Sequence, residues 1–314
     1  MDAVLETRGL SKTYREKTVV DAVDLTVRRG EVYGFLGPNG AGKTTVMKMI
    51  LGLLPPTAGS VALFGRTVGS DRAAVLRRIG MASETPYLYS EMTADEYLGF
   101  FAGLYEVVDP RRRVREILGR FGLSDVAGKR LRTFSQGMAQ RINLARAFLH
   151  DPELLLLDDP VAGLDPRWIK ELRDIIEEAR RRQKTVFLSS HLLSIVETVC
   201  DRVGIIHEGR LIAEDSLEAI TSALTRAQAI TVEVAEMKEG IGEALGRLEE
   251  VTEVTVSGRF LSLRCTGGTA MRERIARAVA EAGGTVLMVR LEKVTLEDTF
   301  LELTEGNVSL LGKS

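Results

Sequence analysis

The sequence predicts an α/β domain followed by a small α+β domain. Two largely apolar segments, residues 154–157 and 186–189, are typical of strands buried on both faces of a parallel sheet. A third apolar segment, residues 32–36, leads into a glycine-rich loop and then into a helix from about Thr44. From residue 229 onward the predicted order becomes β-α-β-β-α-β, the pattern of a split βαβ or ferredoxin-like fold.

Local signals place the remaining elements of the first domain. The first thirty residues alternate apolar and polar side chains, which predicts half-exposed antiparallel strands. Thr93 and Glu96 form a capping-box pattern that begins a helix extending to about Leu104, and a largely helical stretch follows to about Leu149. Asp165 and Pro166 supply an N-cap and a first-turn proline for a further helix. We therefore expect a mixed sheet, an antiparallel β subdomain and a helical subdomain.

The second domain is predicted from shorter segments. Strands are expected at 229–234, 251–256, 260–264 and 285–291, and helices at 240–248 and 272–282. A short helix at 296–303 follows. The resulting boundaries are 1–220 for the first domain, 221–228 for a linker, 229–306 for the second domain and 307–314 for a tail.

Composition excludes several classes of protein. The formal net charge of −2 gives no positive field that would attract nucleic acid, so we expect no nucleic-acid partner. Two distant cysteines and three histidines predict neither a disulfide framework nor a zinc site. No segment approaches the ~18 apolar residues of a membrane helix, and the N-terminus lacks a signal-peptide layout. We expect a cytoplasmic protein that acts on the membrane only through another chain.

The glycine-rich loop matches the phosphate-binding pattern G-x-x-x-x-G-K-[ST] at every fixed position. Its residues are Gly37, Pro38, Asn39, Gly40, Ala41, Gly42, Lys43 and Thr44. Glycines let backbone N–H groups face phosphates, and the following helix N-terminus adds partial positive charge. We expect Lys43 to be exposed and to bridge the terminal phosphates, and the Thr44 hydroxyl to hold Mg²⁺. The loop predicts a nucleotide site.

Further motifs follow in a fixed order. They are Phe134-Ser135-Gln136-Gly137-Met138, then Leu154 to Asp158-Asp159-Pro160, then Ala162-Gly163-Leu164-Asp165-Pro166, then Ser190-His191. Together with the phosphate loop, they make residues 1 to about 220 resemble the nucleotide-binding subunits of ABC transporters. The resemblance implies a P-loop ABC-type nucleotide-binding domain that hydrolyses ATP and works as one half of a pair enclosing two nucleotides.

The resemblance also implies roles for individual residues. Asp158, at the end of a predicted buried strand, would meet Mg²⁺ through water, because a buried carboxylate needs a compensating cation. An aspartate that caps the next helix is the alternative. Ser135, Gln136 and Gly137, at a helix start, would contact the γ-phosphate of the ATP held by the opposite subunit.

Three further residues are assigned in the same way. His191 would orient the γ-phosphate and the attacking water. Tyr14 would stack on adenine, although an ordinary strand tyrosine remains the alternative. Thr45, which follows the phosphate loop, is also expected to contact the nucleotide. The expected cofactors are therefore ATP and Mg²⁺.

Two positions depart from the family pattern. The residue after Asp158 is normally a glutamate that polarises the attacking water, but here it is Asp159. Its carboxylate is drawn back by roughly 1.5 Å, one C–C bond. Misplacement of that order can cost ~10²-fold in rate, unless the backbone or a second water compensates. Glu84 stands where a glutamine normally reaches Mg²⁺ and water; it suits the metal and adds a charge. We assign Asp159, His191 and Glu84 to catalysis, and Thr44, Glu84 and Asp158 to the metal. Gln136, where glycine is more common, is a milder departure.

The resemblance extends to the type of transporter. The chain has one cassette, and residues 292–303 resemble the end of bacterial exporter ATPases of the drug-resistance and polyketide-efflux type. This implies export through separate permease chains at the inner face of the cell membrane, with residues 84–122 docking a permease helix. A self-contained helical core is the alternative for residues 84–122. The pair would contain a second copy or a homologous ATPase subunit. The alternative is a weakly hydrolysing, ATP-gated dimerisation module or the degenerate partner of an unequal pair.

Overall fold

The computed structural model describes residues 2–67, 72–190, 192–220, 228–265 and 271–291. The chain forms two compact units, Met1–Leu217 and Glu218–Ser314. Four predicted features, namely His191, the linker apart from residue 228, the helix at 296–303 and the tail at 307–314, lie outside the described residues.

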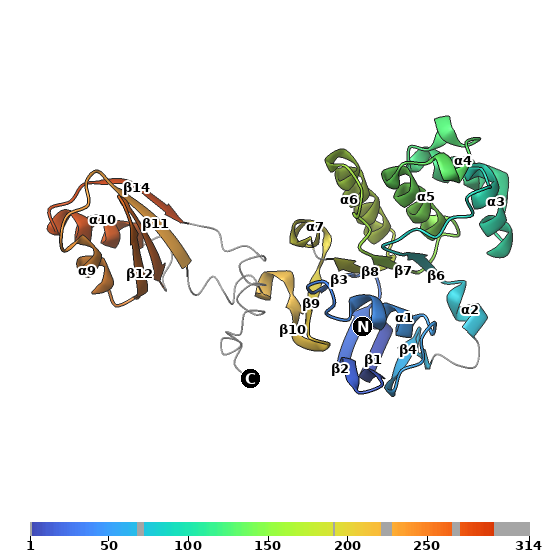
Figure 1. The fold of residues 1–314 in the computed structure, drawn as a ribbon, viewed down its shortest axis with the longest axis horizontal. Helices are drawn as coiled ribbons and strands as arrows, with labels where there is room; N and C mark the ends of the chain where they lie inside the picture. Colours follow the sequence, from blue (N-terminus) through green and yellow to red (C-terminus); the bar gives the residue numbers. More distant parts are fainter. Residues whose placement is uncertain (1, 68–71, 191, 221–227, 266–270, 292–314) are drawn as a thin grey trace. The chain divides into compact units, whose positions relative to one another are not determined.

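The first unit is built on a six-stranded mixed sheet (Figure 1). Its order is β10-β9-β3-β8-β7-β6, and only β10 runs antiparallel to its neighbour. The strands are β10 (Arg210–Ser216), β9 (Arg202–His207), β3 (Val32–Leu36), β8 (Thr185–Ser190), β7 (Leu154–Asp158) and β6 (Ile79–Ala82). Every residue of β3, β7 and β8 is buried, as their apolar sequences predict.

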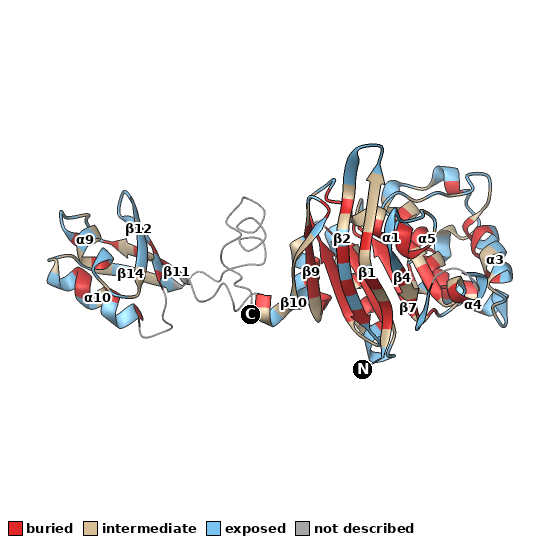
Figure 2. Cartoon of the chain, turned by 90° about the horizontal axis from the view of Figure 1, so that it is seen from below, coloured by how far each residue is buried: buried red, intermediate tan, exposed pale blue. Residues whose placement is uncertain are grey.

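A second, four-stranded antiparallel sheet has the order β2-β1-β4-β5. Its strands are β1 (Ala3–Tyr14), β2 (Lys17–Arg28), β4 (Ala58–Leu63) and β5 (Arg66–Thr67). Helix α1 (Lys43–Ile50) shares one hydrophobic core with both sheets, which includes Leu5, Val23, Met47, Phe35 and Leu156. Figure 2 shows this burial along the strands, and buried and exposed residues alternate along the second half of β2. The alternation confirms the predicted antiparallel subdomain.

Three helices form the helical part of this unit. They are α3 (Ala94–Leu104), α4 (Pro110–Arg120) and α5 (Gln136–Phe148). The capping box is present, because Thr93 Oγ1 accepts from the Glu96 N–H and Glu96 Oε2 accepts from the Thr93 N–H. Short 3₁₀ turns at Ser124–Val126 and Leu131–Thr133 connect α4 to α5. The remaining helices are α2 (Arg72–Leu76), α6 (Pro166–Arg181) and α7 (Leu193–Val199).

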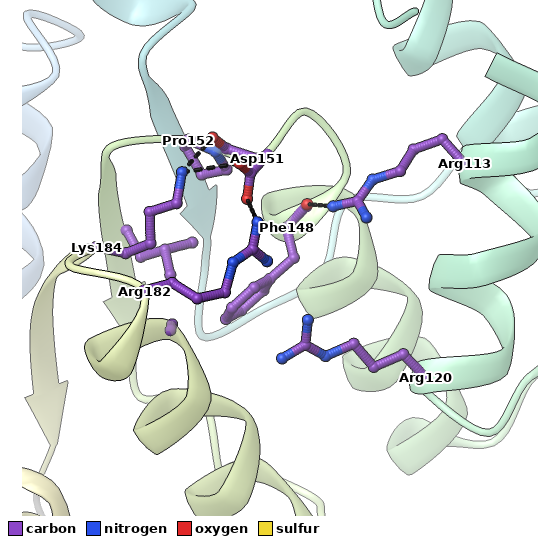
Figure 3. Close-up of a pocket in the computed structure, with 9 residues that line it drawn as sticks. Arg113, Arg120, Phe148, Asp151, Pro152, Arg182 and Lys184 are labelled. Atoms are coloured by element: carbon purple, nitrogen blue, oxygen red, sulfur yellow. Dashed lines mark hydrogen bonds and ion pairs between the residues drawn. The ribbon is translucent and has the colours of Figure 1, made fainter. Parts of the chain in front are cut away.

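A small pocket lies among α4, the end of α5, α6 and the start of β8 (Figure 3). Four cationic side chains line it, but each has a partner. Arg113 donates to the Phe148 and Leu149 carbonyls at the end of α5. Arg120 pairs with Glu178, and Arg182 and Lys184 pair with Asp151. The contacts therefore join α4 and α6 to the C-terminal end of α5.

The second unit contains a four-stranded antiparallel sheet with the order β12-β13-β11-β14. Its elements are β11 (Gln228–Val234), α9 (Ile241–Gly246), β12 (Val251–Ser257), β13 (Phe260–Cys265), α10 (Met271–Glu281) and β14 (Val286–Leu291). Ile230, Leu245, Leu263 and Ile275 are among the residues of its separate core. This βαββαβ order, with the first strand between the third and the fourth, is ferredoxin-like.

Within the parts of the chain that the structure describes, no helix is long and apolar enough to cross a membrane.

Candidate functional site

The phosphate loop connects β3 to α1, and its conformation depends on glycine. A side chain at Gly37 would place Cβ 2.5 Å from the carbonyl oxygen of Ile206, so none fits. Gly40 and Gly42 have φ of 85° and 108°, values that residues with a Cβ rarely adopt. Asn39 and Gly40 are exposed at the tip of the loop. The backbone is therefore held in one shape by its surroundings.

Lys43 begins α1, and its ammonium group lies against the loop. Nζ donates to the carbonyls of Gly37 at 2.6 Å and Pro38 at 3.1 Å. The side chain is half-buried, so the expectation of an exposed lysine is wrong. Burial lowers the pKa of Lys43, and the negative charges of three nearby carboxylates oppose that shift. These carboxylates are Asp159, Asp158 and Glu84.

Asp158 ends β7 next to the phosphate loop. Its Oδ2 accepts from Thr44 Oγ1 at 2.9 Å, and its Oδ1 accepts from Ser189 Oγ. The carboxylate is buried, with only 3% of the residue exposed. The N-cap of the next helix is Asp165, which accepts from the Trp168 N–H, so Asp158 is not that cap. A buried carboxylate beside a hydroxyl offers the hard oxygen ligands that Mg²⁺ takes, so these residues fit the ion.

Asp159 follows directly and has an unusual backbone. Its φ is 42°, in the left-handed region that aspartate tolerates better than most residues. The conformation is held by two backbone hydrogen bonds, from Asp159 N–H to Ser189 O and from Ala162 N–H to Asp159 O. Only 6% of the residue is exposed. Burial and the fixed backbone leave its carboxylate little room to move.

Glu84 follows β6 closely and is exposed. Its negative charge acts on Lys43, as do those of Asp158 and Asp159. The segments that carry Lys43, Glu84 and the two aspartates therefore lie close together. The ends of β3, β7 and β6 therefore converge on the phosphate loop. This is where parallel α/β sheets commonly hold ligands.

The stretch from Ser135 to Gly137 lies at the start of α5. Ser135 is the N-cap, and its hydroxyl accepts from the Met138 N–H at 3.3 Å. Ser135 and Gln136 are exposed. A Cβ added at Gly163 would lie 2.7 Å from Gln136 Cγ, so the Gln136 side chain packs on this glycine. This stretch contacts α5 and the segment after β7.

The other predicted nucleotide contacts lie at the edges of this region. Tyr14, at the end of β1, is 47% exposed, and Lys12 Nζ lies 5.3 Å from its ring centre. Thr45 is half-buried in the first turn of α1. Ser190, which precedes His191, accepts from the Leu192 N–H at 2.9 Å.

Sequence reasoning missed three polar residues of this region. Ser189 donates to Asp158, and the amides of Gln140 and Asn143 are 1% exposed inside the protein. Ser189 was detectable as a polar residue at the end of a buried strand next to that of Asp158. Gln140 and Asn143 were detectable as polar residues three positions apart on a helix that also carries apolar residues.

Comparisons with known proteins agree with this geometry. The family model described as ABC transporter matches residues 20–162. The bacitracin transport ATP-binding protein BcrA of Bacillus licheniformis is 44% identical over 215 residues, 68% of this chain and 70% of that protein. The daunorubicin resistance ATP-binding protein DrrA3 of Streptomyces coeruleorubidus is 36% identical over 306 residues, 96% of each chain.

A solved structure described as the ATP-binding subunit of an ABC transporter is also similar. It is 34% identical, with a TM-score of 0.66, and the match covers 70% of this chain and 92% of that one. The chain therefore belongs to the ATP-binding proteins of ABC transporters, ATPases whose activity is coupled to transport.

Proposed function

We propose that this protein powers export of a substrate through a separate membrane permease, by ATP-driven closure of a pair of ATP-binding subunits. The observation that carries the proposal is the convergence of Lys43, Thr44, Asp158, Asp159 and Glu84 at one end of the central sheet. This set combines a phosphate-binding cation with carboxylates for a metal ion and for water.

The first step is nucleotide binding. The N–H groups of the phosphate loop and Lys43 would hold the phosphates, with Lys43 exchanging the Gly37 and Pro38 carbonyls for phosphate oxygens. Thr44 and Asp158 would hold Mg²⁺, which neutralises developing charge on the phosphates when it is bound. The exposed ring of Tyr14 is available for stacking on the base.

Hydrolysis needs a water molecule held for attack. Asp159 would polarise this water, with Glu84 and His191 orienting it and the γ-phosphate. Asp159 is buried beside Lys43, so its carboxylate acts at a low effective dielectric, where hydrogen bonds to water are strengthened.

The pairing model is supported by the exposed start of α5. Ser135 and Gln136 present a helix N-terminus to the surface, and anions bind favourably at such positions. In the family pattern this stretch completes the ATP site of the opposite subunit. A pair would therefore enclose two nucleotides.

Export through a permease is supported by the names of relatives, which concern bacitracin transport and daunorubicin resistance. A docking surface for the permease is supported by a group of exposed large apolar residues in and around α3. They are Tyr87, Tyr89, Phe100, Leu104 and Val108. Docking there would place the protein at the inner face of the cell membrane.

A second candidate is a weakly hydrolysing clamp or the degenerate partner of an unequal pair. It is favoured by the short side chain of Asp159 and its left-handed backbone. In that case ATP would hold two subunits together for a long time between rare hydrolytic events.

The pairing model is tested by measuring the molecular mass of the purified chain with and without ATP. We expect ATP to drive monomers into dimers and Ser135→Arg to prevent this while nucleotide still binds. Ser124→Arg is the matched control, because it adds the same side chain at another exposed position and should still allow dimers. Full specific activity of a strict monomer at high dilution would rule out the model.

A further inference from the structure

Three polar side chains, two on α5 and one just after it, donate to backbone carbonyls of β6 and of Ser83, which follows β6. Asn143 Nδ2 donates to Ser83 O at 2.8 Å, Arg146 Nη2 to Met81 O at 3.1 Å, and His150 Nε2 to Ile79 O at 3.0 Å. β6 is an edge strand of the six-stranded sheet, so its outer carbonyls have no neighbouring strand. These side chains take the place of that strand, and the bond from Asn143 to Ser83 O ends next to Glu84.

A second amide on α5 extends this connection to the segment after β7. Gln140 Nε2 donates to Pro160 O at 3.3 Å, and Gln140 Oε1 accepts from Asn143 Nδ2 at 3.4 Å. Pro160 directly follows Asp159. Two buried amides, three residues apart on one helix, therefore contact the chain immediately before Glu84 and immediately after Asp159.

The orientation of both amides is fixed by their partners. Asn143 Oδ1 accepts from Arg146 Nη2 at 3.2 Å, so the Asn143 NH₂ group faces Ser83 and Gln140. Gln140 Oε1 faces Asn143, so the Gln140 NH₂ group faces the Pro160 carbonyl. Each donor meets an acceptor, and a satisfied polar network of this kind holds a single arrangement.

We propose that Gln140 and Asn143 are positioning residues for hydrolysis, which hold Glu84 and Asp159 at a fixed separation through the backbone of Ser83 and Pro160. The inference rests on the proposed roles of those two carboxylates. Neither amide touches the reacting atoms; each acts on the segment that carries a carboxylate. Because Ser135 is the N-cap of α5, this helix connects the segments that carry Glu84, Asp159 and Ser135.

The first experiment compares near-isosteric variants that cannot make these bonds. Gln140→Met and Asn143→Leu should lower kcat by about tenfold or more, since displacement of catalytic groups by about 1 Å can cost ~10²-fold. Their affinity for a slowly hydrolysed ATP analogue should stay within about threefold of the parent's. His150→Phe is the matched control, because it removes one bond to β6 at Ile79, far along β6 from Glu84, and retains an aromatic ring against Tyr105.

All rates are measured well below the unfolding temperature of each variant, which is recorded in parallel. His150→Phe should lose stability while its kcat stays within about twofold of the parent's. If Gln140→Met does not fold, Gln140→Glu replaces it, since it keeps the acceptor for Asn143 and loses the donor to Pro160. Amide variants whose kcat is no lower than that of the control would overturn the inference.

A double-mutant cycle separates positioning from general stability. If Gln140 acts through Asp159, Gln140→Met should change kcat by less than about twofold in an Asp159→Asn background. If Gln140→Met lowers kcat by the same factor in both backgrounds, the inference is overturned and the proposed function still stands. An Asp159→Asn variant with the parent's kcat would instead refute the proposed role of Asp159, and the inference with it.

Discussion

Asp159→Glu restores the side chain that the family pattern has at this position. The added methylene moves the carboxylate forward by roughly 1.5 Å. If Asp159 is held back from the attacking water, glutamate should raise kcat by about tenfold, equivalent to about 1.4 kcal/mol of activation free energy. The affinity for ATP should change little, because the phosphates are bound by the loop and Lys43.

The same substitution should cost stability. Only 6% of Asp159 is exposed, and its φ is 42°. Inserting a methylene into a packed site typically costs about 1–3 kcal/mol, and glutamate tolerates the left-handed region less well than aspartate. We therefore expect a variant that is faster but unfolds at a lower temperature.

The assay is phosphate release at saturating ATP for the parent, Asp159→Glu and Asp159→Asn, with thermal unfolding of each. Asp159→Asn should remove most of the parent's activity, because the amide is a poor base. A glutamate variant that is slower than the parent, with unchanged ATP affinity, would refute the reasoning. It would show that the left-handed backbone already presents Asp159 correctly to the water.

Three further predictions follow from the structure. Lys43→Ala should abolish tight ATP binding while the chain stays folded, as measured by nucleotide titration and thermal unfolding; affinity within about threefold of the parent's would contradict the site. Deletion of residues from about 225 should leave ATP binding intact and alter dimerisation, since the second unit has its own core; loss of ATP binding by a folded truncated chain would contradict this. Burial lowers the pKa of His150 to about 4 from 6.5, so the unfolded chain binds an additional proton between these pH values. The free energy of unfolding, measured with urea, should therefore fall by up to about 3 kcal/mol as the pH drops through this window. If His150 is the group responsible, the free energy of unfolding of His150→Phe should depend less on pH over the same range.

Residues that carry their own local signal were predicted closely. The apolar run at 154–157 became β7, and the side chains of Thr93 and Asp165 marked the starts of α3 and α6. A capping side chain and a run of apolar residues each occupy only a few neighbouring positions, so the sequence pattern is sufficient to predict these elements. The phosphate loop was equally clear, because glycine, lysine and threonine occur there at fixed spacing.

Other features depend on contacts that the sequence does not record. The left-handed backbone of Asp159 has no glycine to mark it, since it is imposed by hydrogen bonds to Ser189 and Ala162. The burial of Lys43 follows from the loop carbonyls that surround its ammonium group. The roles of Gln140 and Asn143 appear only when α5 is placed against β6 and the segment after β7, because periodicity alone does not tell which strand a helix face meets.

The packing around the phosphate loop bears on the thermodynamics of nucleotide binding. Added side chains at Gly37 and Gly42 would meet the carbonyl oxygens of Ile206 and Val19, and the Gly209 N–H donates to Ala41 O. Neighbouring strands therefore order the loop, and the ligand does not have to. Fixing one residue's backbone costs roughly 1–2 kcal/mol of conformational entropy. For the loop residues held by these contacts, this entropy is lost when the chain folds, so ordering them does not lower the affinity for ATP.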